Sequence, residues 1–408
     1  MVLDYANKLS EVVLKKGINL KKGQCLNIVV GPRSYEYASI MARKAYEMGA
    51  KYVQITVNDT RLDATRSVVQ SKDEDLQFVP SYLKNADYEY IAENWARVRI
   101  DSGEDRIDEV DSDLDRLQII TKAKRQNGKE YSNKTMANEL SWNVCAVPGP
   151  MWARKIMGAD ATEEDLANVM SKIMRLDRED YLEAWDEFDK INKKRANYLN
   201  SLGIKELHYR SPRTDFKVGF RREARFSGAS NTLPDGTSFF PNLPTEEIFS
   251  VPDMDTASGY ITTTKPVTVL DNETEEVKLY FEKGKVIDVE AKKGLDIMRK
   301  YLAIDEGSSK LGEVALVDVT SPIAMSNLVF GSILIDENAS CHIAIGAGYP
   351  ECLETEYPIS SDEELLKLGC NVSLVHTDFM VGSDDLEIVA TTYEGKSVTI
   401  MKDGRFTL

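Results

Sequence analysis

The hydrophobic periodicity of this chain changes near residue 205, and this change restricts the fold classes that it can adopt. Before that point, stretches with the helical period alternate with short apolar runs that are typical of buried strands. Segments that alternate in this way form βαβ units, whose strands are parallel. We therefore expect an N-terminal α/β domain, a parallel sheet with flanking helices. The expected helices cover residues 4–16 and 32–47, and the expected strands cover 25–30, 51–57, 88–92, 117–120 and 142–147.

After residue 205, apolar and polar residues alternate with period two. Such alternation is typical of strands that bury one face. Gly284 and the pair Asp403-Gly404 fall between or beside these runs and are hairpin signals. We therefore expect a β-rich α+β domain in the C-terminal half. The alternating runs cover residues 206–210, 215–220, 259–264, 277–290 and 396–401.

A strongly helical and highly charged segment separates the two halves. Two helices fit residues 162–202, the second from Asp180 to Leu199 and closed by Gly203. Interspersed acidic and basic residues indicate a solvated face, which suits a connector between domains. The predicted organisation is an N-terminal domain at 1–160, a helical connector at 161–204 and a C-terminal domain at 205–408.

The charge balance argues against nucleic acid and anionic membranes as partners. Lys and Arg number 51 against 67 Asp and Glu, a net charge of −16, whereas both partners require a positive face. The five cysteines are scattered without a C-x-x-C pair, which fits a reducing compartment better than a disulfide framework. The first residues contain no apolar stretch typical of a signal peptide. We expect a soluble, cytoplasmic protein.

The first strand-to-helix turn carries no phosphate-binding fingerprint. It reads Gly31-Pro32-Arg33-Ser34, which matches neither G-x-G-x-x-G nor a P-loop. A nucleotide site is therefore not predicted in the N-terminal domain.

The stretch from Cys341 to Val381 contains two of the three histidines in the chain. His376 precedes Asp378 by two residues in a strand-like run, so the two side chains point to the same face. His342 begins another apolar run. Two imidazoles and a carboxylate on neighbouring strands are most of a divalent metal site. Two buried, hydrogen-bonded histidines in a sheet would give the same pattern, and the residues alone leave both interpretations open.

Two segments place carboxylates beside apolar residues. Glu246 and Glu247 lie between two prolines, and Glu313 stands at the entry of an apolar strand, where an unpaired carboxylate is costly. The alternatives are a loop or helix-start acid at Glu247 and a salt-bridged strand-end acid at Glu313. Cys341, next to His342 on a strand, should point to the opposite face and pack in the core.

Four segments together resemble the aminopeptidase T / AmpS / PepS metallopeptidase family, also called thermophilic aminopeptidases. They are NLPTEEIFSVPD (242–253), KLGEVALV (310–317), CHIAIGAGYP (341–350) and HTDFMVG (376–382). The key residues stand 66 (313−247), 29 (342−313) and 34 (376−342) positions apart, in the order of the family. The similarity extends over the whole chain, including PGPMWA at 148–153.

The resemblance implies a dinuclear metal site with a bridging water in a C-terminal catalytic domain. It implies that Tyr349 lines the metals and polarises the substrate carbonyl or the tetrahedral oxygen; Glu246 receives no role. The resemblance implies two divalent ions per chain, and ligands without thiolate admit Zn, Co or Mn. The implied metal ligands are Glu247, Glu313, His342, His376 and Asp378.

The activity implied by the resemblance is removal of N-terminal residues from peptides by a metal-dependent aminopeptidase, expected to be a homodimer. The alternatives are a dinuclear amidase or esterase on a non-peptide substrate, and a catalytically silent binding homologue. Three other candidates are interpreted as structural: His208 on a strand, the arginines Arg221, Arg222 and Arg225 at a solvated strand end, and a turn at Asp235-Gly236-Thr237.

Overall fold

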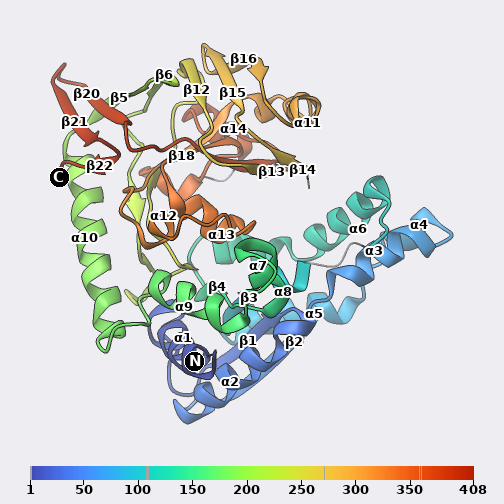
Figure 1. Cartoon of the computed structure of the whole chain (residues 1–408). Coiled ribbons are helices and arrows are strands. Elements are labelled where there is room, and N and C mark those ends of the chain that lie inside the picture. Colours follow the sequence, from blue (N-terminus) through green and yellow to red (C-terminus); the bar gives the residue numbers. More distant parts are fainter. Residues whose placement is uncertain (1, 107–109, 271, 358, 360) are drawn as a thin grey trace. The chain divides into compact units, whose positions relative to one another are not determined.

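The computed structural model of the chain describes residues 2–106, 110–270, 272–357, 359 and 361–408 (Figure 1). The chain forms two compact units: residues 1–186 with 230–244, and residues 187–229 with 245–408. Residues 230–244 thus pack with the first unit although they lie beyond residue 205. Because these units are defined by packing alone, the expected division into an N-terminal domain, a connector and a catalytic domain, with boundaries at residues 160 and 204, stays a prediction.

The first unit is built on a five-stranded sheet in the order β10-β4-β3-β1-β2. Its strands pair in parallel throughout, which confirms the expected α/β domain. The central strand β1 is buried along its whole length, as expected for a parallel sheet with covered faces. The strands are β1 (Cys25–Val30), β2 (Tyr52–Val57), β3 (Ala96–Asp101), β4 (Trp142–Ala146) and β10 (Asn242–Leu243), with a separate pair β8 (Asn231–Thr232) and β9 (Ser238–Phe239).

Two segments expected to be strands, 88–92 and 117–120, are helical and correct the sequence-based expectation. The first lies in α5, where Tyr90 packs on Trp95 and Tyr131; the second lies in α6. Short apolar runs fit both periods, and the Asp113 N-cap, which accepts from the backbone N–H of Arg116, is the signal that favours a helix at α6. The helices of this unit are α1 (Val2–Val12), α2 (Tyr35–Glu47), α3 (Thr60–Val69), α4 (Asp73–Leu76), α5 (Ser81–Ala92), α6 (Leu114–Asn127), α7 (Lys129–Met136), α8 (Pro150–Met157) and α9 (Glu163–Ile173), with short turns η1 (Val13–Gly17), η2 (Pro32–Ser34) and η3 (Gly103–Arg106).

The carboxyl edge of this sheet is where open α/β folds commonly bind ligands. A depression of about 210 Å³ lies there, lined by the ends of β1 and β3. The carboxylate of Asp105 already caps the start of the following helix, because it accepts hydrogen bonds from Arg33 N (2.8 Å) and Ser34 Oγ (2.6 Å). An ideal Cβ at Gly31 would lie 2.1 Å from that carboxyl group. An internal side chain thus takes the position that a phosphate takes in nucleotide-binding folds.

The charged segment forms two helices, as expected. Thr162 and Asp165 build a reciprocal capping box at the start of α9. The second helix, α10 (Tyr181–Ser201), is followed by Gly203, whose φ of 58° suits a helix end. No helix in the described part of the chain combines the length and the apolar character that crossing a membrane would require.

The second unit contains two larger sheets, which confirms the expected β-rich character. An eight-stranded antiparallel sheet runs β16-β15-β12-β6-β5-β20-β21-β22, and a five-stranded one runs β19-β18-β17-β11-β7. The larger sheet consists of β5 (Ile204–Ser211), β6 (Thr214–Gly219), β12 (Ser258–Thr262), β15 (Lys278–Glu282), β16 (Lys285–Glu290), β20 (Glu387–Thr392), β21 (Ser397–Lys402) and β22 (Arg405–Phe406). The smaller sheet consists of β7 (Ser227–Gly228), β11 (Ile248–Ser250), β17 (Leu311–Leu316), β18 (His342–Gly346) and β19 (His376–Met380).

The remaining elements of the second unit are short. A strand pair stands apart from the two larger sheets, and the helices and turns connect or flank their strands. They are β13 (Val267–Val269), β14 (Asn272–Thr274), α11 (Leu295–Tyr301), α12 (Pro322–Ser326), α13 (Ile333–Asp336), α14 (Asp362–Lys367), η4 (Gly307–Ser309), η5 (Glu337–Ala339) and η6 (Pro350–Cys352).

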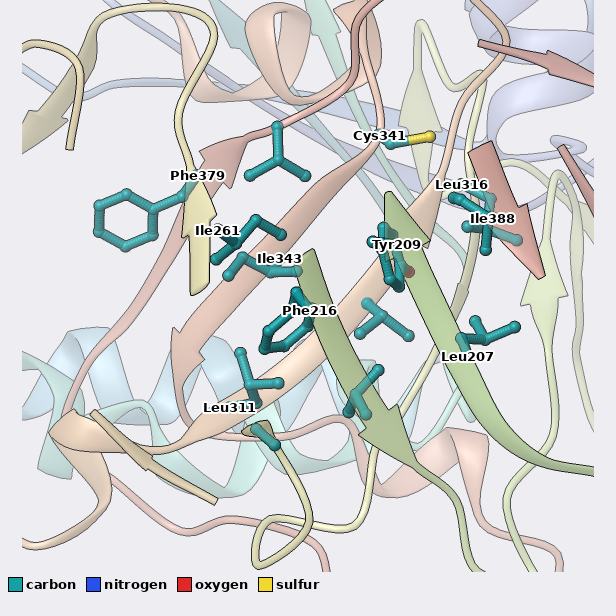
Figure 2. Close-up of a cluster of buried hydrophobic side chains, with 14 of the residues drawn as sticks. Leu207, Tyr209, Phe216, Ile261, Leu311, Leu316, Cys341, Ile343, Phe379 and Ile388 are labelled. Carbon is teal, nitrogen blue, oxygen red and sulfur yellow. The ribbon is translucent and has the colours of Figure 1, made fainter. Parts of the chain in front are cut away.

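The core of the second unit contains side chains from both larger sheets. Ile343 from β18 and Leu316 from β17 gather there with Tyr209 and Phe216 from the larger sheet (Figure 2). Cys341 belongs to the same buried cluster, which confirms its expected packing role. Since strand residues alternate between faces, the other face of the five-stranded sheet remains for polar side chains.

Candidate metal centre

The register of the five-stranded sheet gathers the predicted ligands on one face. Glu313 pairs with Ala344 across β17 and β18, and Ala344 pairs with Asp378 across β18 and β19. Directly opposed residues share a face, so Glu313 and Asp378 flank Ala344 on either side. His376 lies two residues before Asp378 on the same strand, as the sequence predicts.

The remaining two ligands lie on opposite sides of β17, His342 on β18 and Glu247 next to β11. Ala315, two residues after Glu313, pairs with Phe249 of β11 and with His342 of β18. Glu247 directly precedes β11 and reaches the same group. The structure therefore brings together all five side chains that the sequence singled out.

The five side chains form two overlapping groups with Glu313 in both. Glu247, Glu313 and His342 form one group, and Glu313, His376 and Asp378 the other; within each, the potential ligand atoms lie within 4.8 Å of one another. His342 Nε2 is 3.1 Å from Glu247 Oε2. His376 Nε2 is 3.4 Å from both Glu313 Oε2 and Asp378 Oδ1. One carboxylate thus links two triads.

Small residues form the floor beneath the two groups. Ala315 lies between Phe249 and His342 in the register, and Ala344 lies between Glu313 and Asp378. Both alanines are fully buried beneath the neighbouring side chains. The register shifts at Gly312, where an ideal Cβ would lie 2.1 Å from the carbonyl oxygen of Ala347, so this position requires glycine.

Both histidines are oriented by backbone carbonyls. His376 Nδ1 is 2.7 Å from Ala347 O, and His342 Nδ1 is 3.1 Å from Ser340 O. A carbonyl can only accept, so each Nδ1 carries the proton and each Nε2 faces the carboxylates. This arrangement is the usual outer support of metal-binding histidines.

The titration properties reflect a concentration of negative charge. Burial, opposed by the contact with His376 and reinforced by the charges of Glu247 and Asp378, raises the pKa of Glu313 to about 7. Burial lowers the pKa of His342, but Glu247 and the other carboxylates outweigh burial and raise it to about 10. Burial also lowers the pKa of His376, but Asp378 and Glu313 outweigh it and raise this pKa well above its ordinary value. Both imidazoles therefore hold protons among carboxylates, at positions where a cation is favoured electrostatically.

A further carboxylate, Glu337, faces this group and was missed by the sequence analysis. Burial, together with the charges of Glu247 and Asp378, raises the pKa of Glu337 well above its ordinary value. Asn338 connects the two acidic segments: its Oδ1 accepts from Glu246 N at 2.6 Å, and its Nδ2 is 3.4 Å from Glu337 Oε1. Glu337 stands in the short turn η5, a segment without alternation, so no periodic signal pointed to it.

Tyr349 lies against the second group. Its hydroxyl oxygen is 3.3 Å from His376 Nε2, and the two rings are 4.9 Å apart. Burial, reinforced by Glu313 and Asp378, raises the pKa of Tyr349 well above its ordinary value. The phenol therefore stays protonated and can donate a hydrogen bond beside the cluster.

The other candidates lie outside the cluster. His208 Nε2 contacts Asp215 Oδ1 at 2.6 Å across β5 and β6, in agreement with a structural role. Arg225 pairs with the carboxylate of Glu354. The segment beginning at Asp235 is a turn, as expected, with Gly236 at φ 85°.

Arg221 and Arg222 likewise contact residues of the protein. Arg221 Nε is 2.8 Å from Asp253 Oδ2, and the Arg222 guanidinium lies 4.0 Å from the ring centroid of Tyr393. These contacts agree with a structural role at the strand end.

Comparison with known proteins agrees with this geometry. The profile of the thermophilic metalloprotease family (M29) matches residues 4–406. The chain belongs to this family. Among M29-like relatives, Aminopeptidase 2 from Geobacillus stearothermophilus is 34% identical over 98% of this chain and 97% of its own length. Aminopeptidase PepS from Streptococcus thermophilus is 33% identical, with coverage of 98% and 97%.

A solved structure extends the similarity to the fold. Wild-type AmpT from Thermus thermophilus superposes with a TM-score of 0.89 at 28% identity and covers 100% of both chains. Membership of M29 makes this chain a metal-dependent peptidase, and the carboxylate–imidazole cluster is its candidate metal centre.

Proposed function

We propose that this metalloprotease is an aminopeptidase whose two overlapping triads hold two divalent ions. The observation that carries the proposal is that Glu313 belongs to both triads. A carboxylate has two oxygens and can bridge two cations. A glutamate shared by both triads therefore suits one dinuclear site better than two independent mononuclear sites. Glu247 and His342 would complete one ion's ligands, and His376 and Asp378 the other's.

The residues fit divalent cations on three further grounds. Asp378 Oδ1 is buried and accepts no hydrogen bond from the described residues, and His376 Nε2 contacts it only as an ion pair at 3.4 Å. Ala315 and Ala344, which lie between the ligands in the register, carry no polar group that would compete with an ion for a ligand atom. Mixed oxygen and nitrogen donors without thiolate favour Zn, Co or Mn.

When bound, such a pair of ions would polarise the scissile carbonyl, lower the pKa of a bridging water and hold the free α-amine of the substrate. The protein residues have complementary tasks. Glu337, whose pKa is raised by burial and by Glu247, would accept the proton of the attacking water and return it to the leaving amine. Tyr349, protonated and next to His376, would donate a hydrogen bond to the oxygen on which charge develops.

Two properties of the whole protein belong to the same proposal. All five cysteines are free and buried, which supports a reducing, cytoplasmic location. We also propose a homodimer in which the N-terminal domain restricts access to short or unfolded peptides. Light scattering on the active protein tests this point, and an active monomer would contradict it.

The decisive experiment combines elemental analysis of the purified protein with hydrolysis of leucyl-p-nitroanilide before and after EDTA. We expect up to two divalent ions per chain, and activity that chelation removes and Zn, Co or Mn restores. Glu313→Ala and His376→Ala should abolish turnover by loss of metal, whereas the matched surface variant Glu282→Ala should not. Full turnover in both ligand variants would show that the site lies elsewhere.

A second assay separates an aminopeptidase from an amidase or esterase of broader specificity. An N-acetylated peptide and its free-amine twin are compared at the same concentration. We expect turnover of the free-amine peptide alone. Equal rates would contradict the aminopeptidase assignment, and no turnover of either peptide after metal loading would indicate a catalytically silent binding protein.

A further inference from the structure

One apolar side chain flanks the metal centre on its own face of the sheet. Phe249 on β11 follows Glu247 by two residues and pairs with Ala315, which in turn pairs with His342. The register therefore aligns Phe249, Ala315 and His342 in one row across three strands. Ala315 is fully buried and has the shortest side chain of the three.

The ring of Phe249 is only half-buried, unlike the apolar residues behind it. Val251, Cys352 and Cys370 in the same apolar group are 2%, 0% and 1% exposed. Phe249 packs edge-on against Tyr349, with ring centroids 5.7 Å apart and an interplanar angle of 67°. Part of an aromatic surface thus remains accessible beside the carboxylates.

The position of Phe249 matters because the ligand side chains on the same face are all charged or polar. In a peptide substrate, the side chain of the N-terminal residue is attached to the carbon atom between the α-amine and the scissile carbonyl. If these two groups lie at the triads, this side chain lies beside the triads as well. Phe249, in the row of the first triad, and Tyr349, against the second, pack on each other and would offer such a side chain an aromatic surface. Burial of apolar surface against them would favour binding by the hydrophobic effect.

We propose that Phe249, backed by Tyr349, forms the wall that receives the side chain of the substrate's N-terminal residue. The enzyme would then prefer peptides that begin with a large apolar residue. This inference rests on the aminopeptidase function proposed above and adds its substrate class. Phe249 is in this sense a specificity-determining residue.

The test measures kcat/KM of the metal-loaded enzyme on alanyl-, leucyl- and phenylalanyl-p-nitroanilide. We expect the wild type to prefer the two larger substrates by about tenfold or more. Phe249→Ala should lose about tenfold or more on these two substrates and much less on the alanyl substrate. Phe249→Trp, which preserves the apolar wall but narrows the space, should shift preference towards alanine.

Val251→Ala is the matched control, since Val251 belongs to the same apolar group but is buried. It should lower the free energy of unfolding and leave the ratio of leucyl to alanyl turnover unchanged. As a readout independent of turnover, calorimetry should show that Phe249→Ala weakens binding of free phenylalanine more than that of free alanine.

The outcomes separate this inference from the proposed function. An equal loss on all three substrates in Phe249→Ala would mean that Phe249 only orients Tyr349, and would overturn the inference alone. Unchanged selectivity in both Phe249 variants would overturn it as well. A metal-loaded wild type that hydrolyses none of the three substrates would overturn the proposed function and the inference together.

Discussion

Replacing Glu313, the residue shared by the two triads, with glutamine should change the free energy of unfolding in opposite directions with and without metal. Burial and the charges of Glu247 and Asp378, opposed by the contact with His376, together raise the pKa of Glu313 to about 7. The ordinary value is 4.5. The difference, 7 − 4.5 = 2.5, corresponds to about 3 kcal/mol at about 1.36 kcal/mol per pKa unit.

The direction of the stability change follows from the protonation of Glu313 in the folded and unfolded chain. Below about pH 4.5 the carboxyl group is protonated in the folded and the unfolded chain, so its replacement changes little. Between pH 4.5 and 7 the unfolded chain ionises first, and the free energy of unfolding falls until the folded pKa is passed. In metal-free protein near pH 8, Glu313→Gln should therefore raise the free energy of unfolding by up to about 3 kcal/mol, less the lost contact with His376.

Urea unfolding in EDTA, compared at about pH 5 and about pH 8, measures this difference. Glu282→Gln, which removes an exposed acid of the same unit, is the control and should have no comparable effect. Added zinc should make the wild type more stable than Glu313→Gln, because a ligand at a thousand times its Kd stabilises the protein that binds it by about 4 kcal/mol. A metal-free wild type that is more stable than Glu313→Gln at pH 8, or a difference independent of pH, would refute the reasoning.

Three further substitutions test neighbouring positions. Ala344→Leu should force a larger side chain between Glu313 and Asp378, which flank Ala344 in the register, and so lower both metal content and turnover. Ile343→Leu, on the core face, should lower the free energy of unfolding by less than about 1.5 kcal/mol and keep activity. Elemental analysis and kinetics measure both variants, and two bound ions in Ala344→Leu would contradict the prediction. Tyr349→Phe should lower kcat about 10²- to 10³-fold with little change in metal content, and an unchanged kcat would exclude the hydrogen bond to the developing charge. His208→Ala should leave kcat/KM intact and lower the free energy of unfolding only slightly, because the pair with Asp215 is exposed; thermal unfolding would measure this change.

Much of the fold was accessible from the sequence because periodicity is a local property. The buried runs at 25–30 and 51–57 form parallel strands, and the alternating runs after residue 205 form antiparallel ones. The prediction of strands at 88–92 and 117–120 was wrong because an apolar run of four or five residues fits a turn of helix as well as a strand. Packing of Tyr90 on Trp95 and Tyr131, which no local pattern reveals, accompanies the helix at the first of them.

The sequence by itself determined which side chains share a strand face: His376 with Asp378, and Cys341 opposite His342. It also contained the four segments that identify the family. Only the tertiary structure decided that Glu313 belongs to both triads, that alanines lie beneath them and that Glu337 faces them. The physical reason is that the direction of a side chain follows from its own strand, whereas its neighbours depend on the register between strands distant in the chain.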